Sequence, residues 1–165
     1  MSKHLEVTLD EIDKAADWLK DYAEHKLKAY CEELITRMLR EGEMTARILL
    51  THVDTGNTLS TIMGYRDGNK GMILVGGNAI WIEFGTGIVA NNGAAYPNPA
   101  AENLGMDAIG TYGEGHGSDP NGWYYPGDDG KWHHTFGIPA NMFMYNTAQM
   151  LRREYAKMAK EIFSK

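Results

Sequence analysis

The sequence predicts an α+β fold, in which a small antiparallel sheet packs against a long N-terminal helix and a C-terminal helix. Two observations support this fold class. Near both ends of the chain, apolar residues recur every three or four positions, which is the spacing of a helix with one apolar face. Between them, short apolar and β-branched runs alternate with glycine-rich turn signals, which is typical of antiparallel strands. The length of 165 residues fits one domain over 1–165.

Residues 8–52 are predicted to be helical. Thr8 and Glu11 have the spacing of a capping box, which marks a helix start. Gly42 indicates either a C-cap or a kink, so one bent helix and two successive helices both fit the pattern. The apolar stripe of this helix consists of Ile12, Ala16, Leu19, Ala23, Leu27, Tyr30, Leu34 and Met38.

Residues 58–84 are predicted to form the sheet. The preceding residues, Asp54, Thr55, Gly56 and Asn57, have turn chemistry. The short connections between the apolar runs favour an antiparallel meander. The three expected strands are Thr58–Tyr65, Met72–Val75 and Ala79–Phe84, with a hairpin loop at Arg66–Gly71.

Residues 85–137 are predicted to be a long loop and hairpin insertion whose surface contacts other proteins. This segment holds 12 of the 19 glycines and four of the five prolines. It is also rich in aromatic residues, which disordered linkers usually lack. Within it, Trp123–His134 resembles a β-hairpin, and long loops of this kind are usually functional. The expected interface residues are Trp123, Tyr124, Tyr125 and Trp132.

Residues 140–164 are predicted to be the C-terminal helix. Its stripe includes Met144, Leu151 and Ile162, and Asn141 is the expected cap. Basic side chains gather toward its end, where cations complement the helix dipole.

Composition and charge exclude several classes of protein. The single cysteine, Cys31, rules out an internal disulfide and a multi-cysteine zinc site. No apolar run has the length of a membrane span, and Met1–Glu6 lacks an apolar signal core, so we expect an intracellular site of synthesis. The net charge is −6, and residues 54–139 carry nine acidic and three basic groups. Such a balance disfavours a protein that grips phosphate backbones.

The candidate catalytic chemistry is weak. His133 and His134 lie near loop carboxylates, but neighbouring residues of a strand point to opposite sides, so only one could face a given metal. Cys31 lies beside the apolar stripe, as a small core residue does. Glu83 has no second carboxylate at a readable spacing for acid–base work. The Gly85-Thr86-Gly87 run lacks the remaining glycines and the lysine of a phosphate loop. We therefore expect no catalytic residue, no metal and no cofactor.

Three motifs, in order and at their spacing, resemble a known family. They are Val53-Asp54-Thr55-Gly56-Asn57, then Ile82-Glu83-Phe84-Gly85-Thr86-Gly87, then Gly137-Ile138-Pro139 followed by Phe143-Met144. This order resembles the minor tail-component family of long-tailed bacteriophages, also called neck, tail-completion or head–tail joining proteins. The likeness spans about residues 15–165. Leu59 stands one residue later than in the family pattern, and Met142 stands where the family often has proline.

The resemblance implies a virion structural protein rather than an enzyme. It implies a cyclic homo-oligomeric ring at the phage neck or tail, made in the bacterial cytoplasm, whose neighbours are other neck, connector and tail proteins. Viral DNA would pass through the ring without specific binding, and no membrane is involved. The motif residues expected to have structural roles are Asp54, Thr55, Gly56, Asn57, Glu83, Phe84, Gly85, Thr86, Gly87, Pro139, Phe143 and Met144.

Two alternative functions stay open on the residues alone. One is a small metal-dependent hydrolase that uses His133, His134 and loop carboxylates. The other is a peptide- or glycan-binding module that uses the aromatic loop as a platform.

Overall fold

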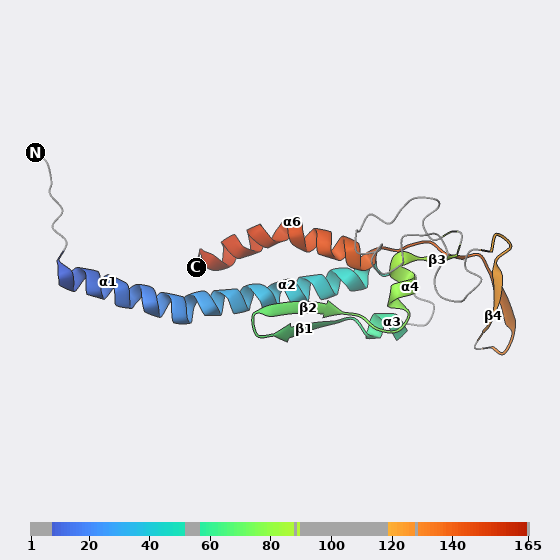
Figure 1. Ribbon diagram of the computed structural model, residues 1–165, viewed down its shortest axis with the longest axis horizontal. Coiled ribbons are helices and arrows are strands. Elements are labelled where there is room, and N and C mark those ends of the chain that lie inside the picture. The colour runs from blue at the N-terminus through green and yellow to red at the C-terminus, as the bar shows by residue number, and fades with distance from the viewer. Residues whose placement is uncertain (1–7, 52–56, 88, 90–118, 128, 165) are drawn as a thin grey trace, which may run out of the picture.

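The computed structural model describes residues 8–51, 57–87, 89, 119–127 and 129–164. The molecule is elongated (Figure 1). A long helical rod runs along much of its length, and the C-terminal helix and a β-hairpin flank the second half of that rod. The N-terminal end of the rod lies at one end of the molecule, and a second hairpin lies at the other end.

The predicted N-terminal helix is confirmed and is continuous. Thr8 and Glu11 form the expected capping box, in which the Thr8 side chain accepts from the Glu11 amide and the Glu11 carboxylate accepts from the Thr8 amide. No break separates the helical segments, although the middle one is π-helical, so the helix is not split in two. The rod consists of α1 (Leu9–Asp21), the π-helical η1 (Tyr22–Leu27) and α2 (Lys28–Leu49).

Gly42 does not cap the rod, which corrects one of the two expectations from sequence. It lies buried within α2, seven residues before the helix ends at Leu49. A Cβ atom at this position would overlap the Ile73 side chain and lie 2.9 Å from Leu151 Cδ1. Glycine is therefore used here because the hairpin and the C-terminal helix both approach α2 closely at this point.

The predicted hairpin after the rod is confirmed, with shifted bounds. β1 (Met63–Asp67) and β2 (Lys70–Leu74) are antiparallel, and Met63 is paired with Leu74 and Tyr65 with Met72. The strand expected from Thr58 is wrong in its first half, because Asn57–Ser60 forms the short helix α3. The Thr58 carbonyl accepts bonds from the amide and the hydroxyl of Thr61, which closes that turn.

The third expected strand is wrong: Ala79–Phe84 is the helix α4. The Asn78 carbonyl accepts bonds from the Trp81 and Ile82 amides, which is helical pairing. Burial at Ala79 and again at Ile82 fits a helix, whereas a strand would bury alternate residues. A short apolar run is compatible with either element, so its period did not decide the matter.

The expected single sheet is replaced, within the described residues, by three two-stranded antiparallel sheets. Besides β1–β2, the short strands β3 (Thr86–Gly87) and β6 (Gly137–Ile138) pair with each other. The predicted hairpin at 123–134 is confirmed as β4 (Trp123–Pro126) and β5 (Trp132–Thr135). It forms the end of the molecule opposite to α1 (Figure 1).

The predicted C-terminal helix is confirmed as α6 (Phe143–Phe163), which packs along α2. Asn141 is not its cap, which corrects the expectation from sequence. The N-cap residue is Met142, whose φ of 53° is left-handed, and its side chain makes no capping bond. The Asn141 side chain instead donates from Nδ2 to Thr51 Oγ1 at 2.8 Å.

The core lies where α2, α4 and α6 meet. Phe143 is completely buried there. None of the helices in the described ranges is apolar over a length sufficient to cross a bilayer. The buried residues of this core are Ala46, Leu50, Ile62, Ala79, Ile82 and Phe143.

Candidate functional site

Glu83 is the central residue of the junction between α4 and α6. Its side chain is only 7% exposed, yet its two oxygens accept the amides of Met144 and Tyr145, both at 2.8 Å. These amides belong to the first turn of α6, which has no partner for them within its own helix. A carboxylate is also favoured at a helix N-terminus by the helix dipole. Glu83 therefore caps α6 from a distance of about 60 residues in sequence.

Main-chain bonds strengthen the same junction. The Ile82 carbonyl accepts the Asn141 amide at 2.9 Å, and the Glu83 carbonyl accepts the Met142 amide at 3.1 Å. Backbone and side chain of α4 thus both hold the chain that leads into α6. This arrangement explains why Asn141 is not needed as a cap.

Gly85 and Gly87 both have positive φ, at 77° and 68°. The sequence placed them at the exit from a strand, whereas they follow helix α4. A Cβ atom at Gly87 would overlap the Phe136 carbonyl group and would lie 2.8 Å from the Trp123 ring. Between them, Thr86 pairs with Ile138, and its hydroxyl accepts the Ile138 amide at 3.2 Å.

The structure thus brings two of the three family-like motifs together. The motif at 82–87 binds the motif at 137–144 through Glu83 and Thr86. Phe143 is fully buried, Met144 is half-buried against the core, and Pro139 is exposed. Of the first motif, Asp54, Thr55 and Gly56 lie outside the described residues, and Asn57 is exposed at the start of α3. The sequence did not indicate that Glu83 is a helix cap, because its partners lie so far along the chain.

The β4–β5 hairpin presents a row of aromatic side chains on one face. Alternation along the two strands places Tyr124 with Trp132, His134 and Phe136. The His134 ring lies 4.8 Å from the Tyr124 ring and 4.9 Å from the Phe136 ring. Trp132 is 70% exposed and Tyr124 66% exposed, so this row is open to a partner.

The opposite face of the same hairpin is partly covered. Trp123 is half-buried over Gly87, whereas Tyr125 is exposed and stacks on His133. Of the four predicted interface residues, Trp123 therefore contributes least accessible surface. The other three, Tyr124, Tyr125 and Trp132, are exposed as an interface requires.

The two histidines that the alternative metal-dependent hydrolase would use, His133 and His134, are held by local partners. His133 Nε2 lies 2.9 Å from Asp129 Oδ1, and this contact, with the Lys131 amide, lowers the pKa of the Asp129 carboxyl. His134 Nε2 lies 2.7 Å from the Asn121 carbonyl oxygen. Within the described part of the chain, no three histidine, cysteine or acidic side chains lie close enough to share a metal ion.

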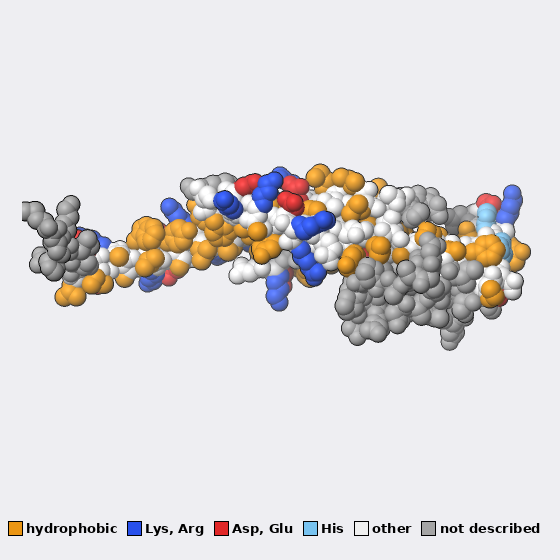
Figure 2. All heavy atoms as spheres, turned by 90° about the horizontal axis from the view of Figure 1, so that it is seen from above, with side chains coloured by type: hydrophobic (Ala, Val, Ile, Leu, Met, Phe, Trp, Pro, Cys, Tyr) orange, Lys and Arg blue, Asp and Glu red, His pale blue; other side chains and the backbone are white. Residues whose placement is uncertain are grey.

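Two further apolar surfaces were not identified from the sequence as contact sites. The first is α1, in which no residue is buried. Its apolar side chains include Leu9, which is 81% exposed, and Trp18, which is 61% exposed. The space-filling view shows apolar side chains along this end of the rod (Figure 2). The second is the outer face of the β1–β2 hairpin, where alternation exposes Met63, Tyr65, Met72 and Leu74.

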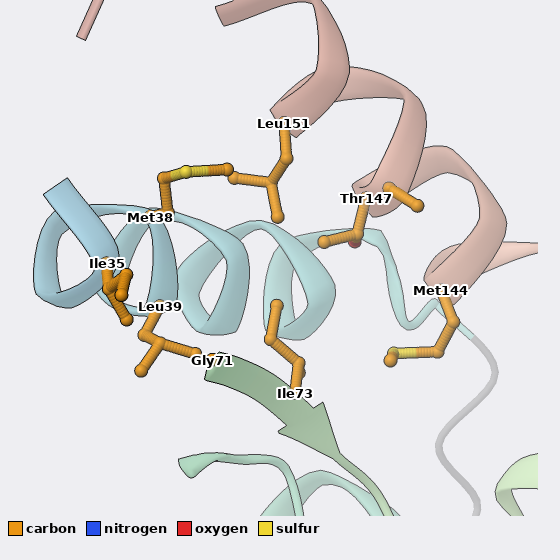
Figure 3. Close-up of a pocket in the computed structure, with 9 residues that line it drawn as sticks. Ile35, Met38, Leu39, Gly71, Ile73, Met144, Thr147 and Leu151 are labelled. Carbon is orange, nitrogen blue, oxygen red and sulfur yellow. The ribbon is translucent and has the colours of Figure 1, made fainter. Parts of the chain in front are cut away.

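An apolar groove with a volume of about 350 Å³ lies between α2, β2 and α6 (Figure 3). The α2 residues form one side, β2 a second side and α6 the third. Its only lining side chain with a polar atom is Thr147, whose hydroxyl donates to the Phe143 carbonyl within α6. The groove residues are Ile35, Met38, Leu39, Gly71, Ile73, Met144, Thr147, Ala148 and Leu151.

Comparisons with protein families, with curated proteins and with solved structures found no match to this chain.

Proposed function

We propose that this protein is a structural subunit that assembles with copies of itself into a ring at the neck or tail end of a bacteriophage virion. The observation that carries the proposal is α1. It is a 13-residue helix with one apolar side and no buried residue. α1 continues into η1 and α2, but no described part of the same chain covers its apolar side, so that side is available to a partner.

The position of the apolar surfaces supports assembly of the head-to-tail kind. The α1 surface, the outer face of β1–β2 and the aromatic row of β4–β5 lie on different parts of an elongated chain. Contacts between two different surfaces repeat from copy to copy, and they close into a ring when the rotation between copies allows it. Large exposed apolar surfaces are in general sites of protein contact.

The assignment to phage structures rests on the motif resemblance. The motif residues that the structure describes act in folding: Glu83 caps α6, Gly87 allows a close backbone approach, and Phe143 fills the core. Such roles suit a scaffold protein. Its partners would be adjacent neck, connector and tail proteins, and duplex DNA would pass through the ring.

The test is the mass of the purified chain by light scattering, together with negative-stain images. We expect a closed ring with a mass of several subunits. A chain that stays monomeric at high concentration, and that does not join purified phage tails or heads, would contradict the proposal.

The aromatic row on β4–β5 favours a second candidate, a glycan- or peptide-binding module. Exposed aromatic faces such as Trp132 stack on apolar faces of ligands. Calorimetric titration with oligosaccharides and peptides tests this candidate. Saturable binding that the Trp132→Ala variant loses would support it.

A further inference from the structure

The groove between α2, β2 and α6 has the form of a receptor for an amphipathic helix. It is partly open to solvent, and apart from Thr147 its lining from three elements is apolar (Figure 3). Helices that bind in such grooves place apolar side chains at helical spacing into the hollow. The volume of about 350 Å³ suits one or two bulky side chains rather than a small polar ligand.

α1 has the complementary shape and chemistry. Ile12, Ala16 and Leu19 follow one another at steps of four and three, so they lie on one side of the helix. Trp18 lies next to these residues and stacks on Tyr22, with the two ring centroids 5.4 Å apart. This aromatic pair widens the apolar side of the helix. None of these residues is buried by the chain's own fold.

A chain cannot place its own α1 in its own groove. α1, η1 and α2 are one continuous helical rod, and the groove uses residues of α2 from Ile35 onward. α1 therefore extends away from the groove along the rod, beyond the end of α6 (Figure 1). An α1 helix that occupies the groove therefore has to come from another copy of the chain.

Charge indicates which pairing of two copies is favoured. α1 carries five acidic and two basic residues. The elements around the groove are neutral to basic: α2 carries four of each sign, the β1–β2 hairpin two basic and one acidic, and α6 four basic and two acidic. Pairing α1 with a second α1 would bring two acidic helices together, whereas pairing it with the groove joins opposite charges.

We infer that α1 of one copy of this chain docks in the α2–β2–α6 groove of the next copy. This inference rests on the proposed self-assembly and gives it a specific contact. Each copy supplies one helix and one groove, so the contact is heterologous and repeats around a ring. Lys70, beside Gly71 in β2, and Arg152, one turn after Ala148 in α6, are placed in sequence next to groove residues, where they suit the acidic helix.

Two variants of the full chain each remove one half of the contact. Leu19→Asp places a charge on the apolar side of α1, and Ala148→Trp fills the groove from an exposed position. Each should weaken self-association more than about a hundredfold, because a buried unpaired charge or a filled site opposes docking. Ile48→Asp is the matched control, since Ile48 is exposed on α2 and does not line the groove.

Mixing the two variants gives the decisive readout. The Leu19→Asp chain keeps an intact groove, and the Ala148→Trp chain keeps an intact α1. A one-to-one mixture should form a heterodimer and nothing larger, because only one intact contact can form. Light scattering measures the mass, and circular dichroism with urea unfolding verifies that each variant keeps its fold.

The possible outcomes separate this inference from the proposed function. Wild-type rings that both variants leave intact would overturn the docking contact alone, and so would a mixture that stays monomeric. A wild-type chain that is monomeric at all concentrations would overturn the docking contact together with self-assembly.

Discussion

α1 and α2 belong to one helical rod and have similar amphipathic sequences, yet their surroundings differ completely. No residue of α1 is buried, whereas α2 packs against both α6 and the β1–β2 hairpin. Periodicity predicted the helix in both halves equally well. It did not indicate which half finds its partner within the chain, because this depends on where distant segments return. The comparison shows that an apolar stripe in the sequence does not by itself tell whether its partner lies within the same chain.

The largest effect should come from a core residue on the α2 side of this comparison. Phe143→Ala removes a fully buried ring where α2, α4 and α6 meet, so the free energy of unfolding should fall by about 3–5 kcal/mol. Trp18→Ala in α1 should change it by less than about 0.5 kcal/mol in the monomer. Urea unfolding at low protein concentration measures both. Equal costs would show that α1 is packed within the monomer.

The next largest effect is expected at Gly87, where β3 pairs with β6 shortly before α6 begins. Gly87→Ala should cost more than about 2 kcal/mol, because φ is 68° and the new Cβ overlaps the Phe136 carbonyl. Gly68→Ala is the matched control: its φ is also positive, at 54°, but nothing lies within 4 Å of the new atom. That change should cost only about 1 kcal/mol. The difference between the two isolates the clash from the backbone strain.

A smaller effect is expected at the cap of α6. Glu83→Gln keeps the size of the side chain but removes its charge and one of two acceptors for the Met144 and Tyr145 amides. The free energy of unfolding should fall by about 1–2 kcal/mol, since bonds to a charged group are stronger than neutral ones. Glu24→Gln, an exposed change on η1, should be close to neutral. A neutral result at Glu83 would mean that the main-chain bonds alone hold the junction.

Local signals in the sequence predicted the local parts of this fold. The capping box of Thr8 and Glu11, the two terminal helices and the Trp123–His134 hairpin depend on neighbouring residues, and all are confirmed. The strand predicted at 79–84 is wrong because a run of six residues, of which all but Glu83 are apolar, fits either element. The bonds from the Trp81 and Ile82 amides to the Asn78 carbonyl identify it as a helix.

The candidate sites were less predictable than the fold, for the same reason. The bonds from Glu83 to α6 join residues about 60 positions apart, and no local pattern marks such a cap. The groove combines single residues from α2, β2 and α6, so it exists only once these elements are packed. The aromatic hairpin was the exception, because its composition is unusual along one short segment.

The smallest effect is a pH dependence that distinguishes α1 from α2. The Gly64 amide, at 3.1 Å, and the Arg47 side chain lower the pKa of Glu43 below its ordinary value of 4.5. A group whose pKa is lower in the folded state stabilises the fold above its unfolded pKa, and this contribution is lost as pH falls through the folded pKa. Glu43 joins α2 to β1, and the Glu43→Gln variant has no titrating group at this contact. The free energy of unfolding of this variant should therefore fall less between pH 6 and pH values below 4.5 than that of the wild type.

Glu11 in α1 also has a lowered pKa, but its partner is Thr8 at the start of the same helix. Glu11→Gln should change the helical content of α1 by circular dichroism and leave the pH dependence of global urea unfolding unchanged. A global effect of Glu11→Gln in the monomer would show that α1 unfolds together with α2, and the contrast between the two halves of the rod would then fail.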